Sequence, residues 1–114
     1  MNDIILFPDR LKYRIFKQPV DMRCGFNKLG EKVFMHLGKH GHDERIIFFF
    51  FNRQRTCVKA LYYTSRMVTI LHGKLLQDEF VIPGFDETQS TLDLSPIAMN
   101  KLLSGLTVSY TRNS

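Results

Sequence analysis

The fold of this chain is decided by residues 46–63, IIFFFFNRQRTCVKALYY. Six consecutive apolar residues are followed by a polar turn with two arginines and then by a second, mostly apolar arm. Two extended segments joined by a short polar loop predict a β-hairpin. Because Ile46–Phe51 is apolar at every position, we expect this arm to be a central strand that is covered on both faces.

The second arm of the hairpin places its side chains alternately on two faces. One face carries Val58, Ala60 and Tyr62, and the other carries Cys57, Lys59, Leu61 and Tyr63. Arg53 and Arg55 lie at the tip, and Lys59 lies a short step down the strand. The sequence therefore predicts a buried hairpin with a cationic tip.

Length and composition predict one globular domain over residues 1–114, with a flexible lead-in at 1–10 and a flexible tail at 107–114. The chain is 44% hydrophobic and contains ten phenylalanines, which is typical of a folded protein. Its net charge of +5 is unevenly placed. Residues 1–77 carry 14 Lys/Arg and 6 Asp/Glu, whereas residues 78–114 carry 2 and 5. A basic surface formed by the first two thirds indicates an anionic partner.

The compartment is expected to be the cytoplasm, with no membrane contact. The N-terminus lacks a signal-peptide core, and no apolar run approaches the ~18 residues that a membrane span requires. Cys24 and Cys57 show no paired spacing, so we interpret them as buried free thiols.

The remaining elements follow from periodicity and capping signals. Residues 11–16 alternate as a half-exposed strand whose outer face is mostly cationic, and Asp21 is expected to cap a helix that ends at Gly38. Gly25 and Gly30 weaken this helix, which indicates either close packing onto the sheet or a helix that begins later than Asp21. Residues 67–74 and 80–82 are expected to be strands, and residues 83–91 a loop. Ser95-Pro96 predicts the start of a second helix that ends at Gly105. The predicted fold is α+β, an antiparallel β-meander sheet with one helix after the first strand and one C-terminal helix.

Five segments, in order, resemble one known family. Residues 20–29, VDMRCGFNKL, resemble "TDMRKGFDGL", residues 48–55 resemble "LFVFRGRRGD", and residues 58–63 resemble "VKILWWD". Lys74-Leu75, Phe80 and Pro83 resemble "KRLERGRFVWP", and the segment from Leu94 to Leu106 resembles "LTPAQLALLLEGI". These motifs belong to the small TnpB accessory proteins of the insertion-sequence sixty-six transposon family, which are distinct from the RNA-guided nucleases of the same name.

The resemblance implies a small accessory protein encoded beside a larger transposase. The chain departs from the pattern at three places: Cys24 replaces a lysine, Tyr62-Tyr63 replace a tryptophan pair, and Thr64 stands where an aspartate is usual. The resemblance supplies a biological setting, the transposition of an insertion sequence, and no defined chemical activity.

Catalytic, metal and cofactor sites are not expected. A two-metal nuclease needs clustered carboxylates, whereas the acidic residues here are scattered over loops and strand ends, where turn roles are ordinary. His40-Gly41-His42 lies in a charged loop and not on a rigid strand. His36 and His40 have the spacing of a helical zinc pair, but Gly38 lies between them and no glutamate follows His36. Solvated loop histidines are the ordinary alternative.

The basic residues give the stronger functional signal. The candidates for nucleic-acid binding are Arg23, Lys28, Arg53, Arg55, Lys59, Arg66 and Lys74. If about six of them contact phosphates on one surface, affinity should fall with salt with a log–log slope near −5. The alternative is a solvated polar face. Of Tyr62 and Tyr63, we expect at most one to be free to stack on a base.

The expected function is that of a non-catalytic accessory protein for DNA transposition. It would bind transposon-end DNA through a basic hairpin face and assist the larger transposase and the other accessory protein of the element. The alternative is a protein-interaction subunit without DNA contact, whose interface would include residues 4–7 and exposed aromatic side chains.

Overall fold

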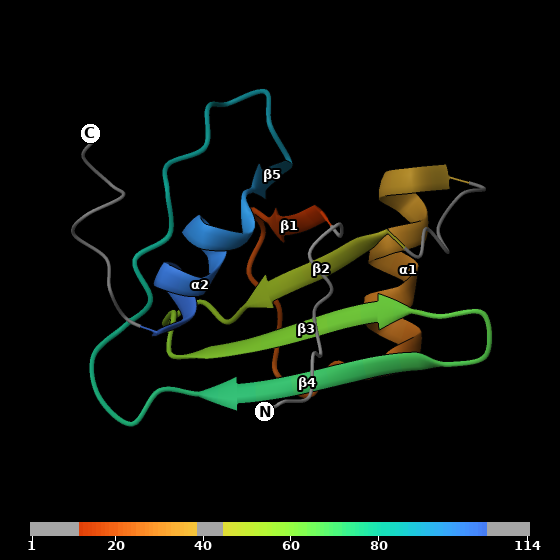
Figure 1. Ribbon diagram of the computed structural model, residues 1–114, viewed down its shortest axis with the longest axis horizontal. Helices are drawn as coiled ribbons and strands as arrows, with labels where there is room; N and C mark the ends of the chain where they lie inside the picture. Colours follow the sequence, from red (N-terminus) through yellow and green to blue (C-terminus); the bar gives the residue numbers. More distant parts are fainter. Residues whose placement is uncertain (1–11, 39–44, 105–114) are drawn as a thin grey trace.

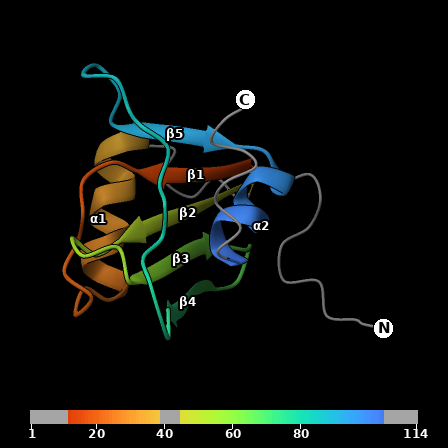
Figure 2. The same cartoon turned by 90° about the vertical axis from the view of Figure 1, so that its left-hand side faces the viewer.

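The computed structural model describes residues 12–38 and 45–104 and contains a five-stranded sheet between two helices (Figures 1 and 2). The order along the chain is β1 (Lys12–Phe16), α1 (Phe26–Leu37), β2 (Ile46–Phe51), β3 (Cys57–Tyr63), β4 (Val68–Lys74), β5 (Thr91–Leu94) and α2 (Pro96–Ser104). In the sheet the strands follow the order β4-β3-β2-β1-β5. The two helices lie on opposite faces of this sheet.

The central strand β2 is buried at all six positions, which confirms the prediction from its unbroken apolar run. Its alternate side chains enter two separate cores. Phe48 and Phe50 pack with Leu29 and Val33 of α1, in what we call the α1-side core. Phe49 and Phe51 pack with residues of α2 on the other face, in the α2-side core. A strand that is apolar on both faces thus requires a covering helix on each side.

The sheet is mixed, so the prediction of an antiparallel meander was wrong while the α+β class is confirmed. The β2–β3 and β3–β4 pairs are antiparallel, as expected for short connections. β1, however, pairs in parallel with β2, with Lys12 opposite Ile46 and Ile15 opposite Phe49. Parallel neighbours need a crossover, and α1 lies in that connection. The short loops after β2 predict the antiparallel pairs, but they do not indicate which strand pairs with β1.

The fifth strand was also assigned to the wrong segment. Residues 80–82 form no strand; they belong to a long irregular loop over residues 75–90, in which Phe80 is buried in the α2-side core. The strand β5 lies further on and pairs antiparallel with the outer edge of β1. Burial of Phe80 explains the apolar signal without any strand, because a loop side chain that enters a core is apolar for the same reason as a strand side chain.

Helix α1 begins at Phe26 after Gly25, which confirms the alternative of a later start and not the predicted cap at Asp21. The Asp21 carboxylate accepts hydrogen bonds from the backbone and side chain of Arg23 instead, and the Cys24 amide donates to the Asp21 carbonyl at 3.0 Å. Because residues 21–24 form this turn, the helix starts further along the chain, at Phe26. The predicted end is confirmed, since Gly38 terminates α1 with φ 69° and its amide donates to the Phe34 carbonyl.

The start of α2 is confirmed at Ser95-Pro96. The Ser95 hydroxyl accepts a hydrogen bond from the Ala98 amide at 3.1 Å, the arrangement of a side-chain N-cap before a proline at the first helical position. α2 ends at Ser104 within the described residues, and the predicted stop at Gly105 lies outside them.

The second face of β1 is not the solvated cationic face that the sequence predicted. Arg14 pairs with Asp93 directly across the β1–β5 ladder, with Nε–Oδ1 at 2.6 Å and Nη2–Oδ2 at 3.1 Å. Its Nη1 lies 3.4 Å from Nε2 of His36 on α1, and Phe16 packs against the α1-side core. The last turn of α1 therefore covers this face, and Arg14 has a structural role.

Other side chains differ from expectation in smaller ways. Cys24 and Cys57 are free, as predicted, but they are half-buried and not buried. Tyr62 packs partly against the α2-side core and Tyr63 against the α1-side core. Residues 1–11, the His40–His42 pair and residues 105–114 lie outside the described part of the chain.

Truncation of β2 tests the two-sided core. Phe49→Ala should lower the free energy of unfolding by about 3–5 kcal/mol, because it opens a cavity in a packed core. Phe48→Ala should cost a similar amount on the opposite face. Chemical denaturation measures both, with the exposed Phe34 as the control position, where the change to Ala should stay within about 0.5 kcal/mol. A loss below about 1 kcal/mol at either core position would contradict packing on that face.

The pH dependence of stability tests the position of His36. Burial, and secondly the nearby Arg14 charge, lower the pKa of His36 below its usual 6.5. The unfolded chain then binds a proton that the folded chain resists, so stability falls as pH drops through 6.5. Between about pH 7.5 and about pH 5, wild type should lose more stability than His36→Gln. Arg14 lowers the pKa of Asp93, so the contribution of Asp93 to stability is lost only at lower pH. His72→Gln, at an exposed position, is the control. If stability changes with pH as much in His36→Gln as in wild type, His36 is not placed as described.

Candidate nucleic-acid interface

The parallel pair β1 and β2 ends at the same edge of the sheet, at Phe16 and Phe51. The loops over residues 17–20 and 52–56 leave from this edge, and the Val20 amide donates to the Phe51 carbonyl at 2.9 Å. In open α/β sheets, ligands bind in the crevice outside the carboxyl ends of the parallel strands. This edge of the sheet is therefore a candidate position for a binding site.

The long loop over residues 75–90 forms the third wall of the crevice. In Figure 2 it crosses in front of the strand ends on its way from β4 to β5. The Phe80 amide donates to the Arg55 carbonyl at 2.7 Å, and the Lys17 amide donates to the Ser90 carbonyl at 2.9 Å. The loop is thus tied both to the hairpin tip and to the end of β1.

Together these three loops enclose a hollow of about 390 Å³, which we call the carboxyl-end hollow. It is lined by Phe16, Lys17, Pro19, Phe51, Asn52, Arg53, Arg55, Ile82, Pro83, Gly84 and Phe85. The lining combines aromatic and aliphatic side chains with three cations, and none of these residues is acidic. Such a hollow is suited to an anion that also carries an apolar part.

The hairpin tip that carries two of the cations is held by Asn52. Its side-chain oxygen accepts hydrogen bonds from the amides of Thr56 and Cys57, both at 2.9 Å, and its amide nitrogen donates to the Thr56 hydroxyl at 3.0 Å. The Arg55 amide donates to the Asn52 carbonyl at 3.1 Å and closes the turn. The backbone under Arg53 and Arg55 is therefore fixed while both side chains are exposed.

Arg55 adopts a left-handed backbone conformation, with φ 60°. For a residue with a side chain this conformation costs about 1–2 kcal/mol, and glycine or asparagine is the usual occupant. An arginine at this place keeps a cation at the rim of the hollow at a cost in backbone energy. Backbone strain of this kind is common at functional sites.

A second hollow of about 480 Å³ adjoins the first and shares Pro19, Asn52 and Arg53 with it. Arg53 therefore stands between two depressions. The second hollow also includes Asp21, whose pKa is lowered to about 2 by hydrogen bonds from the Arg23 side chain and backbone. Asp21 is thus ionised at neutral pH and makes this hollow less attractive to anions than the first.

Arg23 and Lys28 lie near each other at the entrance to α1, where they line a small depression with Asp21 and Cys24. The Arg23 guanidinium pairs with the Asp21 carboxylate at 2.7 Å, so its charge is balanced locally. Lys28 is exposed. This pair borders the hairpin tip only through Asp21 and Met22, which lie beside Arg53.

Lys59 does not reach solvent as the sequence suggested. Its residue is 9% exposed, and Nζ donates a hydrogen bond to the Cys24 carbonyl at 2.6 Å. Because β3 turns this side chain toward the α1 face, the ammonium group holds the loop that leads into α1. Lys59 is a structural residue in this geometry.

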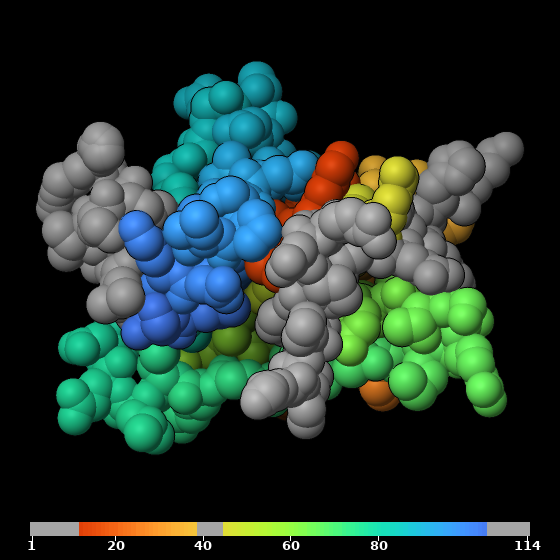
Figure 3. All heavy atoms as spheres, in the orientation of Figure 1, coloured from red at the N-terminus to blue at the C-terminus, as the bar shows by residue number. Residues whose placement is uncertain are grey.

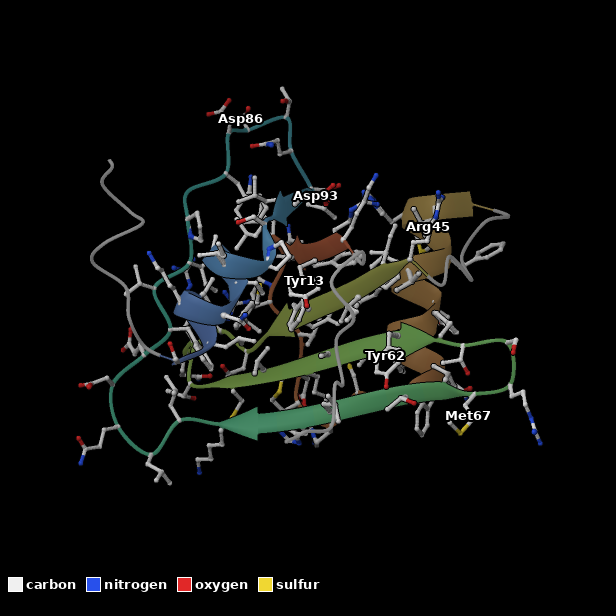
Figure 4. All side chains as sticks on the ribbon, viewed as in Figure 1. Tyr13, Arg45, Tyr62, Met67, Asp86 and Asp93 are labelled. Carbon is white, nitrogen blue, oxygen red and sulfur yellow. The ribbon has the colours of Figure 1, made fainter. Side chains whose placement is uncertain are left out.

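Arg66 and Lys74 lie at opposite ends of the β3–β4 hairpin. Lys74 pairs with Cys57 across the ladder and so lies near the cationic tip. Arg66 belongs to the turn at the other end, beside Met67, which Figure 4 labels near α1. Arg66 lines a different depression, with Phe26 and Tyr63. The seven predicted residues therefore do not share one face.

Lys17 is the lining cation that sequence reasoning missed. It follows β1 directly, and its ammonium group lies 3.4 Å from the Asp86 carbonyl in the third wall. In the sequence, Lys17 is recognisable only as a cation at the end of an alternating strand. The parallel pairing of β1 with β2 brings Lys17 beside Arg53 and Arg55. Figure 4 labels Asp86 in the loop above α2.

Two kinds of feature are absent among residues 12–38 and 45–104, a cluster of metal-ligating side chains and a membrane-spanning helix. No group of three or more His, Cys, Asp or Glu side chains there is placed to hold a metal ion. In the same described part of the chain, no helix is long and apolar enough to cross a membrane.

Comparison with known proteins gives one family. The family model described as IS66 Orf2 like protein matches residues 11–113, nearly the whole chain. No match was found among curated proteins or among solved structures.

The structural role of Lys59 can be tested by truncation. Lys59→Ala should lower the free energy of unfolding by about 2 kcal/mol, because the Cys24 carbonyl loses a charged hydrogen-bond donor in a mostly buried place. The exposed Lys28→Ala is the matched control and should change stability by less than about 0.5 kcal/mol. Thermal or urea denaturation measures both. If the two variants are equally stable, the Lys59 amine does not hold this loop.

Proposed function

We propose that this chain, which belongs to the family of IS66 Orf2-like proteins, is a non-catalytic accessory factor of transposition that contacts DNA through the carboxyl-end hollow. Family membership supports the transposition setting. The single observation that carries the DNA contact is the convergence of Lys17, Arg53 and Arg55, from two separate loops, on one hollow whose lining contains no acid.

The chemistry of these side chains suits phosphate. Arginine presents a planar fork of donors that matches a phosphate group, and lysine supplies a compact point charge. The Asn52 hydrogen bonds fix the backbone of the tip. The backbone therefore loses little conformational entropy when the arginine side chains bind phosphate. Lys74, near the tip, and Lys28, beyond it, would extend the contact to neighbouring phosphates, whereas the charge of Arg23 is balanced by Asp21. Lys59 and Arg66 are not part of this proposed surface.

The proposed role in transposition follows from phosphate contact. Such contacts fix position and orientation on DNA without reading sequence. The chain would hold the element ends in place for the larger transposase, which would supply the chemistry and the sequence readout.

A second candidate function is a protein-interaction subunit that docks the transposase without touching DNA. It is favoured by large apolar side chains that remain exposed on and beside α1: Phe26, Phe34, Met35 and Met67. Met35, for example, is 83% exposed. Exposed apolar groups of this size are common at protein interfaces. Residues 4–7, the other part of this alternative, lie outside the described residues.

The double variant Arg53→Gln with Arg55→Gly separates the two candidates. It removes two cations, and glycine relieves the left-handed conformation at position 55, so stability should be equal or higher by up to about 1 kcal/mol. DNA affinity should fall, and the log–log salt slope should become shallower by about 2. Fluorescence anisotropy with labelled DNA over a salt series gives both values.

Arg66→Gln is the matched control, because it removes an exposed cation at the far end of the hairpin. It should leave affinity and slope near wild type. Wild-type protein that fails to bind DNA at low salt would leave the protein-interaction candidate, whose test is co-purification with the transposase after Met35→Glu. DNA binding that the Arg66 control weakens as much as the double variant would locate the contact elsewhere.

A further inference from the structure

We propose that the carboxyl-end hollow accommodates one unpaired nucleotide, so that the chain prefers single-stranded over duplex DNA. This inference rests on the proposed function and adds the form of DNA that it binds. The observation behind it is that aromatic side chains and exposed cations line the same hollow of about 390 Å³.

The aromatic lining residues come from both sides of the sheet edge: Phe51 and Phe85 from the α2-side core, and Phe16 from the α1-side core. Phe51 is 3% exposed and meets Phe80 edge-on, with ring centroids 5.2 Å apart, so it forms the floor. Phe16 is stacked on Phe50 at 4.6 Å, which occupies one of its ring faces. Both rings are therefore partly committed to the cores.

Phe85 is the ring that remains for a ligand. It is half-buried, packs beside the α2-side core, and has no aromatic ring contact within the described part of the chain. It belongs to the loop over residues 75–90, which two backbone hydrogen bonds anchor to Arg55 and Lys17. The loop that carries the Phe85 ring is thus hydrogen-bonded to the backbone of Arg55 and Lys17, two of the residues that supply cations.

The cations lie at the rim because their side chains are exposed while the apolar lining is half-buried or buried. Lys17 stands on the β1 side, and Arg53 and Arg55 stand on the hairpin side. A nucleotide has the same division, with a flat apolar base and an anionic phosphate on one side. The base would enter the hollow and the flanking phosphates would remain at the rim.

A base pair does not fit this arrangement. In duplex DNA each base is covered by its neighbours and paired at its edge, so it presents no face to an aromatic ring. Volumes from about 300 Å³ upward are typical of small-molecule sites, and this hollow is near the lower end of that range. Only a base that is already unpaired, or is turned out of the helix, reaches the interior.

The space-filling view shows which segments form the surface at this end of the molecule. In Figure 3 the residues after β4 (teal) and α2 (blue) form the surface at one side, and the β3–β4 turn (green) lies at the other. The exposed Gly84 has no heavy atom within 4 Å of the place where a Cβ would stand. A side chain at Gly84 would therefore occupy open space beside the hollow without disturbing the wall.

The test compares a labelled single strand with a duplex of the same sequence in anisotropy titrations at one salt concentration. Stacking of one base should favour the single strand by roughly 5- to 150-fold. Phe85→Leu keeps an apolar side chain but removes the ring, so it should lose most of this preference while duplex binding stays unchanged. Phe85→Tyr, which restores a ring, should recover it. Phe34→Leu, an exposed aromatic position on α1, is the matched control and should have no effect.

Gly84→Leu provides a second route if Phe85→Leu proves unstable. It should retain the wild-type melting temperature, because the Cβ position is in open space, and it should weaken the single-strand preference, because it adds bulk at a residue that lines the hollow. Equal affinity for single strand and duplex, unchanged by either variant, would overturn this inference and leave the proposed DNA contact standing. Absence of binding to both forms at low salt would overturn the proposed function itself.

Discussion

The parallel pairing of β1 with β2 is the constraint on which the rest of this structure depends. It places the first strand beside the most apolar strand of the chain, with Ile15 opposite Phe49 in the middle of the sheet. A parallel neighbour requires a crossover, and here the crossover is α1, which covers Phe48 and Phe50. The same pairing brings the ends of two strands that are far apart in the sequence to one edge. The crevice, its cations and its aromatic lining all follow from that edge.

Several charged side chains are engaged in contacts within the fold. Arg14 is engaged by Asp93 and lies beside His36, Lys59 holds the Cys24 carbonyl, and Arg23 is paired with Asp21. A net positive charge read from the sequence therefore overstates the charge that a partner meets. The cations that remain at the hairpin tip are few but lie close together, so their attractions for one nearby phosphate add.

The hairpin tip combines order with strain. Asn52 closes the turn with its own side chain, and Arg55 takes a conformation that a glycine would adopt more easily. An ordered backbone loses little entropy when its side chains bind, so affinity depends on the contacts themselves. The long loop that follows β4 adds a third wall at the same point, and loops of this length without regular structure are often functional.

The sequence by itself determined the elements whose cause is local. The six apolar residues of β2 indicated a strand covered on both faces, Ser95-Pro96 marked the start of α2, Gly38 marked the end of α1, and the ordered motifs indicated the family. It also identified Arg53 and Arg55 at the hairpin tip. These predictions succeeded because periodicity, caps and turns depend on residues a few positions apart.

Only the tertiary structure decided where β1 and β5 lie, that Lys59 points inward, and that Lys17 meets the hairpin tip. Strand order is set by the packing of both sheet faces at once, and a loop residue such as Phe80 gives the same apolar signal as a strand. The site is built from residues 16–19, 51–55 and 82–85, segments that are 27 to 69 positions apart in the sequence and adjacent only in the folded chain. Local patterns contain the residues of such a site, but long-range packing alone brings them together.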